Sequence, residues 1–539
     1  MMTDPAVRVR QLLEEYGSPQ ACAAELLCDR HPADAVAFTV IENDLSATDL
    51  TFGELRERST RFAAALAGLG VQPGDRVGVL MGKSADLVTV LLGIWRRGAV
   101  HVPLFTAFAA PAVAFRLASS AAKVVVADAD QLSKLAPGED IPADPAWQVI
   151  VAGEAEGELS VGGPLSQYSA DDPRGAAVAV GPDGLLVQLY TSGTTGTPKG
   201  VPVPLRALAS LQLYQEFGLD VRAEDVYWNI ADPGWAYGLY YTLLTPLVTG
   251  MRSLLLHSGF SAALTWQVLE RFGVTNFAAA PTVYRALRAD SATAPTGLAL
   301  RRASSAGEPL TPDIPAWSVG TLGLAVRDHY GQTETGMLIA NAWQDDVRTE
   351  TRPGSMGQPL PGFTMAILAE DADTVLGPRE QGRVVVDRQQ SPGMWFPGYV
   401  DAPEKTASRY AGEGRWYLTG DAGMVDEDGF FYFSARDDDV IIMAGYRIGP
   451  FDVESVLVLH DSVIEAAVVG MPDELRGEVI EAFVVLREGI APGPDLETEL
   501  QQLVKTKFAA HAYPRTVHFV DSLPKTPSGK VQRFLLRQR

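Results

Sequence analysis

The chain has 539 residues, too many for one ordinary domain, and its 47% hydrophobic content is typical of globular proteins with a large buried core. Acidic residues outnumber basic ones by 66 to 44, and the resulting formal net charge of -22 argues against nucleic acid or an anionic membrane as the main partner. The only cysteines, Cys22 and Cys28, are too few for disulfide bonds to stabilise a chain of this length, which favours a reducing cytoplasm. We find neither an apolar signal segment at the N-terminus nor an apolar run of about 18 residues, so we expect no secretory signal and no membrane span.

The first half of the chain alternates helical and strand patterns. Thr51 and Glu54 have the spacing of a capping box, and the pattern that they open predicts a helix over 51–70. A second helix is expected over 84–99, and short apolar runs predict buried strands over 75–81, 122–128, 253–258 and 274–281. Alternation of this kind favours parallel sheets covered by helices on both faces, hence an α/β fold.

Two stretches interrupt this alternation. Residues 130–185 are rich in Asp, Gly and Pro, and we expect a surface excursion there rather than a domain boundary. A sharper boundary is expected at "SARDDDV" (434–440), where three acidic residues separate two apolar runs. The residues after this boundary predict a small α+β domain, with strands near 465–470, 481–486 and 516–525 and a helix over 495–513.

The stretch "YTSGTTGTPKG" (190–200) has the composition of a phosphate-binding loop. It follows a predicted buried strand and combines the hydroxyls of Thr191, Ser192, Thr194 and Thr195 with three glycines and Lys199, which suits close approach of an anion to backbone N–H groups. Two residues separate Gly196 from Lys199, so the spacing is not that of a Walker A loop.

This stretch resembles the phosphate loop of the adenylate-forming superfamily, which includes acyl-CoA synthetases, luciferases and peptide-synthetase adenylation domains. The resemblance continues in the family's order and is dense from about residue 200 onward. It is carried by "SSAGEPL" (304–310), "YGQTETG" (330–336), "YLTGDAG" (417–423), "ARDDDVIIMAGYRIGPFDVES" (435–455) and "PKTPSGKVQR" (524–533).

The resemblance implies a fold, a reaction and its co-substrates. The fold would be a large N-terminal domain of stacked mixed β-sheets flanked by helices (1–436) and a small, mobile α+β C-terminal lid domain (437–539), with a hinge near Asp438. Such enzymes use ATP and Mg²⁺ to convert a carboxylic acid to an acyl-adenylate, and a thiol, usually that of coenzyme A, then displaces AMP.

The resemblance also implies roles for individual residues. Lys530 would be catalytic because an ammonium between the carboxylate and the α-phosphate stabilises both charges as they approach. Thr333 would contact the α-phosphate and Glu334 would bind Mg²⁺. The remaining nucleotide contacts would be Thr191, Ser192, Gly193, Thr194, Thr195, Gly196 and Lys199 for the phosphates, Gly307, Glu308, Pro309, Asp328, His329 and Tyr330 for adenine, and Asp421 and Arg436 for ribose.

Coenzyme A would enter after the small domain rotates. Gly445 would then line the pantetheine tunnel, with Tyr446 and Arg447 beside it and Lys505 as a candidate phosphate contact.

Among family members the chain looks closest to short- and medium-chain acyl-CoA synthetases. Trp235, Ala236, Tyr237 and Ala306 would line the acid. Gly331 stands where acetate-specific relatives carry a tryptophan, so we expect an open pocket and a largely apolar acid larger than acetate. Asp232 would suit an amino group, but fatty-acid relatives also carry an aspartate there.

Some positions depart from the family pattern. Pro202 and Pro204 replace a histidine-containing segment, Met424 replaces a common arginine, and "SAR" (434–436) replaces the usual "GR". Three alternatives therefore stay open: thioester formation from a supplied adenylate, transfer of the acyl group to a carrier-protein thiol, and a non-catalytic nucleotide- or acyl-binding protein.

Overall fold

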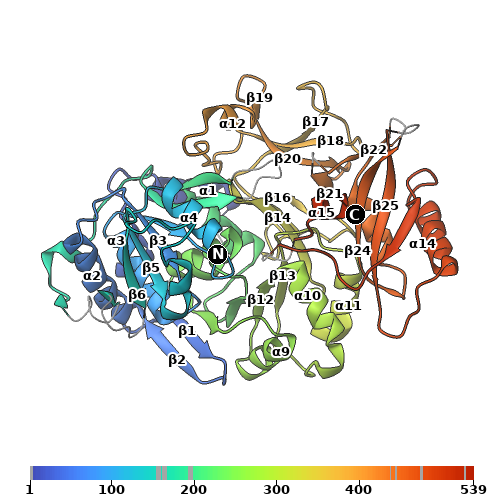
Figure 1. The fold of residues 1–539 in the computed structure, drawn as a ribbon. Helices are drawn as coiled ribbons and strands as arrows, with labels where there is room; N and C mark the ends of the chain where they lie inside the picture. The colour runs from blue at the N-terminus through green and yellow to red at the C-terminus, as the bar shows by residue number, and fades with distance from the viewer. Residues whose placement is uncertain are drawn as a thin grey trace.

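The computed structural model describes residues 4–152, 159–160, 167–191, 198–436, 439–443, 446–473, 477–526 and 530–538. Its strands form four sheets, and the two largest supply the framework of the N-terminal part (Figure 1). A smaller sheet with β17, β18 and β20 lies above them in this view, and the C-terminal strands with α14 lie at the right.

The first large sheet has seven strands in the order β7-β6-β5-β3-β4-β8-β9. All neighbours pair in parallel except the last pair, β8 and β9. The strands are β3 (Arg76–Leu80), β4 (Val100–Pro103), β5 (Val124–Asp128), β6 (Gln148–Ala152), β7 (Leu159–Ser160), β8 (Leu185–Thr191) and β9 (Lys199–Pro204).

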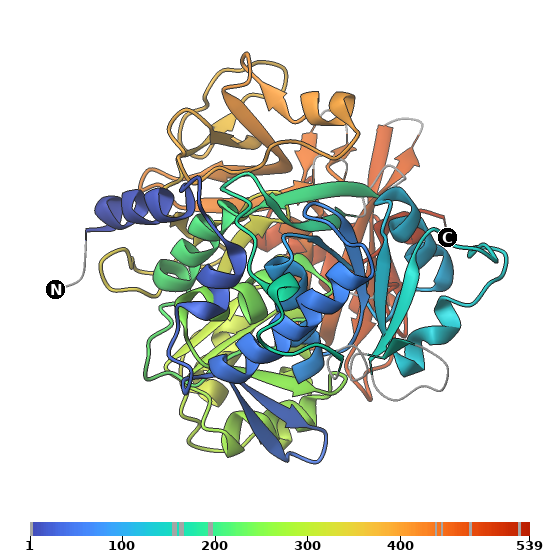
Figure 2. The same ribbon diagram turned by 90° about the vertical axis from the view of Figure 1, so that its left-hand side faces the viewer.

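Helices α2 (Phe52–Gly68) and α3 (Ala85–Arg96) cover this sheet and face the viewer in Figure 2. The capping box expected at the start of α2 is present, because Thr51 accepts from the backbone N–H of Glu54 while the Glu54 carboxylate accepts from the Thr51 N–H. Nearly all of α3 is buried, which is why its sequence is apolar on every face. Helix α4 (Ala110–Ser119) follows β4.

The second large sheet has nine strands in the order β16-β15-β14-β13-β12-β10-β11-β1-β2. Its centre is parallel, and antiparallel strands close both edges. The strands are β1 (Val36–Glu42), β2 (Ala47–Thr51), β10 (Tyr227–Asn229), β11 (Ser253–His257), β12 (Asn276–Ala279), β13 (Arg302–Ser305), β14 (Arg327–Gln332), β15 (Gly336–Ala340) and β16 (Gln358–Pro359).

Helices accompany this second sheet. They are α1 (Pro5–Tyr16), α6 (Ala207–Leu213), α7 (Ala236–Gly238), α8 (Thr245–Thr249), α9 (Ala262–Arg271), α10 (Pro281–Ala289) and α11 (Asp313–Leu322). The chain widens into π-helical turns at Tyr214–Gly218 and Leu239–Leu244. One continuous hydrophobic core joins the helices and strands of both large sheets.

The third sheet contains β17 (Met365–Leu368), β18 (Gly382–Asp387), β19 (Tyr410–Ala411), β20 (Trp416–Val425) and β21 (Phe431–Arg436), with the short helix α12 (Pro403–Ala407) before β19. The fourth sheet is built only from residues after 440 and has a hydrophobic core of its own. Its strands are β22 (Ile441–Met443), β23 (Tyr446–Ile448), β24 (Val463–Asp473), β25 (Gly477–Leu486) and β26 (Thr516–Phe519), accompanied by α13 (Pro450–Leu457), α14 (Pro494–Lys507) and α15 (Arg533–Leu536).

The expected helices and strands are present, with differences in their bounds and a correction in the segment 130–185. This segment is more than a surface excursion, since it contributes β6 and β7 to the edge of the seven-stranded sheet. Ile150 and Val151 are fully buried there, and their short apolar run is the signal that the surrounding Asp, Gly and Pro obscured. The C-terminal helix is also shorter than expected and ends at Lys507.

The prolines after Lys199 lie on β9, at the other edge of that sheet. An edge strand tolerates proline because one side of it has no ladder partner to lose. The carbonyl of Gly200 on the same strand accepts a hydrogen bond from the N–H of Val400 at 2.9 Å. Pro202 and Pro204 therefore fit the fold without breaking the sheet.

No helix in the described part of the chain combines the length and apolar character that crossing a bilayer requires.

Candidate active site

A cavity of about 1380 Å³ lies where the carboxyl ends of the two large sheets meet. Its walls include Lys83 after β3, Phe105 after β4, Asp232 after β10, Gly307 after β13 and Glu334 after β14. Parallel strands place such residues at one edge of a sheet, where α/β proteins bind their ligands. The topology thus gathers residues that are up to several hundred positions apart.

At one end of the cavity, Asp421 is held by three donors. The Tyr330 hydroxyl donates to its Oδ2, the Gln332 amide donates to the same oxygen at 2.8 Å, and Arg436 Nη1 lies 3.1 Å from Oδ1. The carboxylate is 3% exposed and retains acceptor capacity for further hydroxyl groups. Tyr330, Asp421 and Arg436 are therefore brought together as expected. Gln332 lies within the quoted motif "YGQTETG", but no role was expected for its amide.

A second wall is formed by the segments expected at the adenine. Gly307 has a φ of 104°, a conformation that favours glycine, and Glu308 and Pro309 follow it along the wall. Opposite them, desolvation raises the pKa of Asp328 well above its usual range. His329 accompanies Asp328, and its Nδ1 lies 2.7 Å from the Tyr214 hydroxyl.

His329 has no acid–base role near neutral pH. Desolvation lowers the pKa of its imidazole to about 3, so the ring is neutral.

Glu334 lies at the phosphate end of the cavity. Its Oε1 accepts from the Tyr399 hydroxyl at 2.8 Å, and that hydroxyl accepts from Arg409 Nε at 3.0 Å. Lys199 lies with its ammonium 5.1 Å from the centre of the Tyr399 ring. Desolvation, reinforced by Arg409 and Lys405, lowers the pKa of Lys199. This excess of cations suits a polyphosphate.

Tyr399 and Arg409 were not found from the sequence, because they lie between the recognised motifs. Of the phosphate loop itself, Thr191 and Lys199 are described and line the cavity. Ser192, Gly193, Thr194, Thr195 and Gly196 lie outside the described residues.

Lys530 is an exposed residue whose side chain lines the same cavity. The N–H of Thr526 donates to the Lys530 carbonyl at 2.8 Å, and Lys525 bridges to Val531 at the base of the loop. Desolvation inside the cavity lowers the pKa of the ammonium, while the nearby carboxylates of Glu308, Asp421 and Glu334 act in the opposite direction.

The Lys530 ammonium is therefore near the groups expected to bind adenine, ribose and Mg²⁺. Thr333 also lines the cavity, and its carbonyl accepts from the Tyr240 hydroxyl at 2.9 Å.

Aromatic side chains line the remaining part of the cavity. Trp235, Ala236, Tyr237 and Ala306 contribute as expected, together with Phe105, whose ring centre lies 5.2 Å from that of Trp235. Tyr240 and Tyr241 come from the π-helical turn that follows, and such turns are frequent at functional sites.

The expected opening at Gly331 needs a correction. Gly331 lines the cavity, but a Cβ there would lie 2.3 Å from the Gly336 carbonyl oxygen and 2.6 Å from the Met337 Cα. The glycine is required by the close approach of β15, and the Met337 sulfur lies 2.8 Å from the same point. Gly331 therefore borders the cavity, but the direction in which its side chain would point is occupied by the backbone of β15 and the flexible side chain of Met337.

The residues expected to contact coenzyme A are not gathered in this cavity. Gly445 and the hinge residue Asp438 lie outside the described residues, and Tyr446 and Arg447 are described only as the backbone of β23. Lys505 is on α14, with its ammonium 3.9 Å from the centre of the Tyr513 ring.

Within the described residues, no group of three or more His, Cys, Asp and Glu side chains could hold a metal ion. Mg²⁺ bound with a nucleotide needs only one or two protein carboxylates, since phosphates and waters supply the other oxygens. Glu334 alone therefore fits the expected magnesium site.

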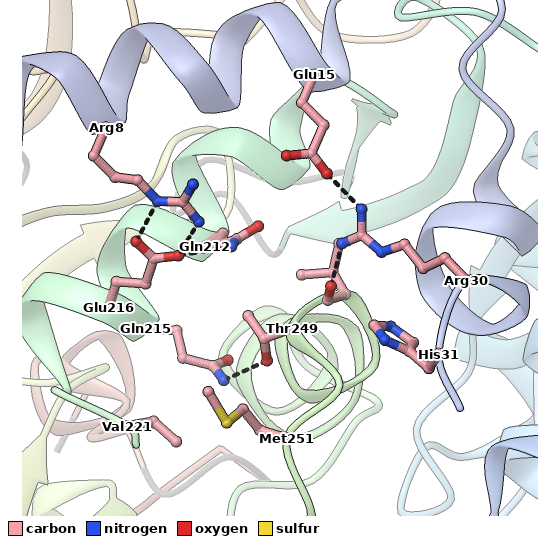
Figure 3. A pocket seen from close by; sticks show the side chains of 11 residues that line it. Arg8, Glu15, Arg30, His31, Gln212, Gln215, Glu216, Val221, Thr249 and Met251 are labelled. Atoms are coloured by element: carbon pink, nitrogen blue, oxygen red, sulfur yellow. Dashed lines mark hydrogen bonds and ion pairs between the residues drawn. The ribbon is translucent and has the colours of Figure 1, made fainter. Parts of the chain in front are cut away.

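A second cavity, of about 400 Å³, lies beside α1 (Figure 3). Its charged side chains pair with one another, Arg8 with Glu216 at 2.6 Å and Arg30 with Glu15. These pairs tie α1 to the large domain, and the charges there are already compensated.

Two family models match the chain. Residues 25–400 match the model described as AMP-binding enzyme, and residues 452–530 match the AMP-binding enzyme C-terminal domain. The chain belongs to the AMP-binding enzyme family. It is an ATP-dependent acid:CoA ligase that forms an acyl-adenylate and then the coenzyme A thioester.

Named relatives of this AMP-binding enzyme cover nearly all of its length. An acetyl-coenzyme A synthetase of Bacillus subtilis is 39% identical over 90% of this chain and 84% of its own. A solved acyl-CoA synthetase of Brucella canis is 42% identical, with a TM-score of 0.76 over 100% of this chain and 97% of its own. A solved benzoate CoA ligase of Burkholderia xenovorans is 29% identical, with a TM-score of 0.84 over 96% of this chain and 100% of its own.

Proposed function

We propose that this acid:CoA ligase activates a largely apolar carboxylic acid larger than acetate, with a ring or a medium-length chain. The observation that carries the proposal is the aromatic compartment continuous with the Lys530 end of the cavity. Trp235, Tyr237 and Tyr241 present flat apolar faces there, and burial of each methylene group of the acid against them is worth about 0.8 kcal/mol.

The names of the relatives indicate acids of two different sizes. One is an acetyl-coenzyme A synthetase and another is a benzoate CoA ligase. The aromatic lining favours the larger acid, because acetate would leave these aromatic walls without contacts.

In the proposed adenylation step, the carboxylate attacks the α-phosphorus of ATP and pyrophosphate leaves. Lys530 would neutralise the attacking carboxylate and the α-phosphate as they approach, and Thr333 would contact the same phosphate. Lys199 and Arg409 would bind the β- and γ-phosphates, which depart as pyrophosphate. Mg²⁺ supplies further charge neutralisation when bound, with Glu334 as its protein ligand.

The nucleoside would be fixed by the other walls of the cavity. Asp421 would accept hydrogen bonds from the ribose hydroxyls, which its fixed orientation between Gln332 and Arg436 supports. Adenine would lie between the segments of Gly307 and Tyr330.

For the second step we propose a rotation of residues 437–539 about Asp438. Lys530 would leave the cavity, and the segment with Gly445, Tyr446 and Arg447 would approach it, with Lys505 as a more distant phosphate contact. The thiol of coenzyme A would then attack the acyl carbon, and AMP would leave. The separate core of this small unit supports its movement as one body.

Two of the open alternatives are less well supported. Grouping of Lys530, Glu334 and Asp421 in one cavity argues against an enzyme restricted to thioester formation and against a non-catalytic binding protein. Transfer to a carrier-protein thiol uses the same adenylation site and is distinguished by the acceptor alone.

A panel of carboxylic acids with ATP, Mg²⁺ and coenzyme A tests the proposal when AMP and acyl-CoA are measured separately. We expect aromatic or C4–C8 acids to be used with higher kcat/KM than acetate, and the Met337→Ala variant to shift the optimum toward bulkier acids. A strong preference for acetate would refute the size assignment. Product formation with a holo-carrier protein but not with coenzyme A would select the carrier alternative.

We further propose a reducing, cytoplasmic setting. Cys22 and Cys28 are buried, unpaired thiols, and desolvation raises the pKa of Cys28 to about 12, which keeps it unreactive.

A further inference from the structure

A chain of alternating charges joins the catalytic-lysine loop to the nucleotide wall of the cavity. Lys525 Nζ lies 2.8 Å from Glu465 Oε1, and the same oxygen lies 3.6 Å from Arg285 Nε. Arg285 Nη2 in turn donates to Glu308 Oε2 at 3.0 Å. Thr282 completes the chain through its backbone N–H, which donates to Glu308 Oε1 at 3.0 Å.

This series of ion pairs connects the large N-terminal part of the molecule to the small C-terminal unit. Arg285 is on α10 and Glu308 follows β13, both in the large N-terminal part, whereas Glu465 is on β24 of the small C-terminal unit. Lys525 is the base of the loop that presents Lys530, because it bridges to Val531.

These ion pairs lie in a partly buried environment, where the loss of one charge strongly affects the charges that remain. The side chains of Arg285, Glu308 and Glu465 are between 13% and 17% exposed, so water screens them poorly. The two cations and two carboxylates balance as a set. Removal of the Glu465 charge would leave three charges, in which Glu308 still pairs with Arg285 but Lys525 loses its ion pair with Glu465 and faces the cation on α10. The segment of Lys525 would then lose its attachment to α10.

We propose that Glu465 is a positioning residue for Lys530. Its ion pairs with Arg285 and Lys525 hold the small unit in the orientation in which Lys530 reaches the cavity, and Arg285 links that orientation to Glu308 on the nucleotide wall. The inference rests on the proposed catalytic role of Lys530. It assigns the Arg285–Glu465 contact to the adenylation half-reaction alone, since rotation of the small unit must break it.

The test is Glu465→Gln, which keeps the size of the side chain and removes its charge. We expect acid-dependent exchange between ATP and pyrophosphate to fall about 10- to 100-fold, the effect of a misplaced reacting group. Thioester formation from a synthetic acyl-adenylate and coenzyme A should stay within about twofold of the unaltered enzyme, because the contact is absent from that step. Equal loss of both activities, or no loss of either, would overturn the proposal.

Glu481→Gln is the matched control. Glu481 is on β25 of the same unit, pairs with His518 at 2.7 Å and has a side chain 21% exposed, but it does not line the cavity. We expect this variant to keep both half-reactions. If Glu481→Gln lowered the exchange as much as Glu465→Gln does, the effect would come from removing any carboxylate of this unit, and the positioning role of Glu465 would be refuted.

A double variant separates this inference from the proposed role of Lys530. If Glu465 acts through the lysine, Glu465→Gln should cause no further loss of exchange in the Lys530→Ala background. A full additional loss would refute positioning but leave the role of Lys530 intact. If Lys530→Ala alone fails to lower exchange, the assignment of the catalytic lysine fails instead.

Discussion

Tyr399 and Glu334 share a hydrogen bond of 2.8 Å at the phosphate end of the cavity, with the phenol as donor. The same phenol accepts from Arg409 Nε at 3.0 Å. It therefore fixes Glu334, which we propose as the Mg²⁺ ligand, relative to Arg409, which we propose as a phosphate contact.

Tyr399→Phe should weaken adenylation through this contact. Loss of a hydrogen bond to a charged group costs about 1.5–3 kcal/mol, so we expect acid-dependent exchange between ATP and pyrophosphate to fall roughly 10- to 100-fold at limiting Mg²⁺. Excess Mg²⁺ should restore part of the rate. Tyr410→Phe is the control, since its hydroxyl reaches only the Phe396 carbonyl, at 3.4 Å; an equal effect there would contradict the assignment.

Lys530 predicts a specific pH dependence. The proposed role needs the ammonium form, and desolvation lowers its pKa below the ordinary 10.5. The adenylation rate should therefore fall as the pH rises through this lowered pKa, and Lys530→Ala should nearly abolish it. Rates measured between pH 7 and 10 test this.

Lys530→Arg keeps its charge throughout that range. Any residual adenylation in this variant should lack the alkaline fall, and persistence of the same fall would assign it to another group.

Gly331→Ala should destabilise the fold because its Cβ would lie 2.3 Å from the backbone oxygen of Gly336. Overpacking of this kind costs about 1–3 kcal/mol, measurable as a lower urea midpoint. Gly320→Ala on α11 is the control, since a Cβ there meets nothing within 4 Å and alanine favours the helix. Unchanged stability of Gly331→Ala would refute the packing role.

His101 predicts acid sensitivity of the fold. Burial lowers the pKa of this imidazole from 6.5 to about 3, so only the unfolded chain takes up its proton between these values. The resulting stability is complete above pH 6.5 and is lost progressively as the pH falls toward 3. We expect His101→Leu to flatten the dependence of the urea-unfolding free energy between pH 7 and 5. An unchanged slope would contradict the assignment.

Much of this architecture could be predicted from the sequence because its signals are local. The capping box of Thr51 and Glu54 and the apolar strand patterns depend on neighbours along the chain. Motif residues such as Asp421 and Lys530 were found because their surroundings match a family pattern. Gln332, Tyr399 and Arg409 were missed because their hydrogen bonds join segments that are distant in the sequence. Gly331 lines the cavity as expected, but the close approach of Met337 on β15 is not visible in the sequence.

The two prolines of β9 have a consequence for the buried edge of the seven-stranded sheet. Pro202 and Pro204 alternate with the same parity as Gly200, whose carbonyl already bonds to Val400. Neither proline has an N–H to offer at these two positions. The segment that departs most from the family pattern thus places its prolines on a buried edge strand, where their missing N–H groups leave no ladder partner unsatisfied.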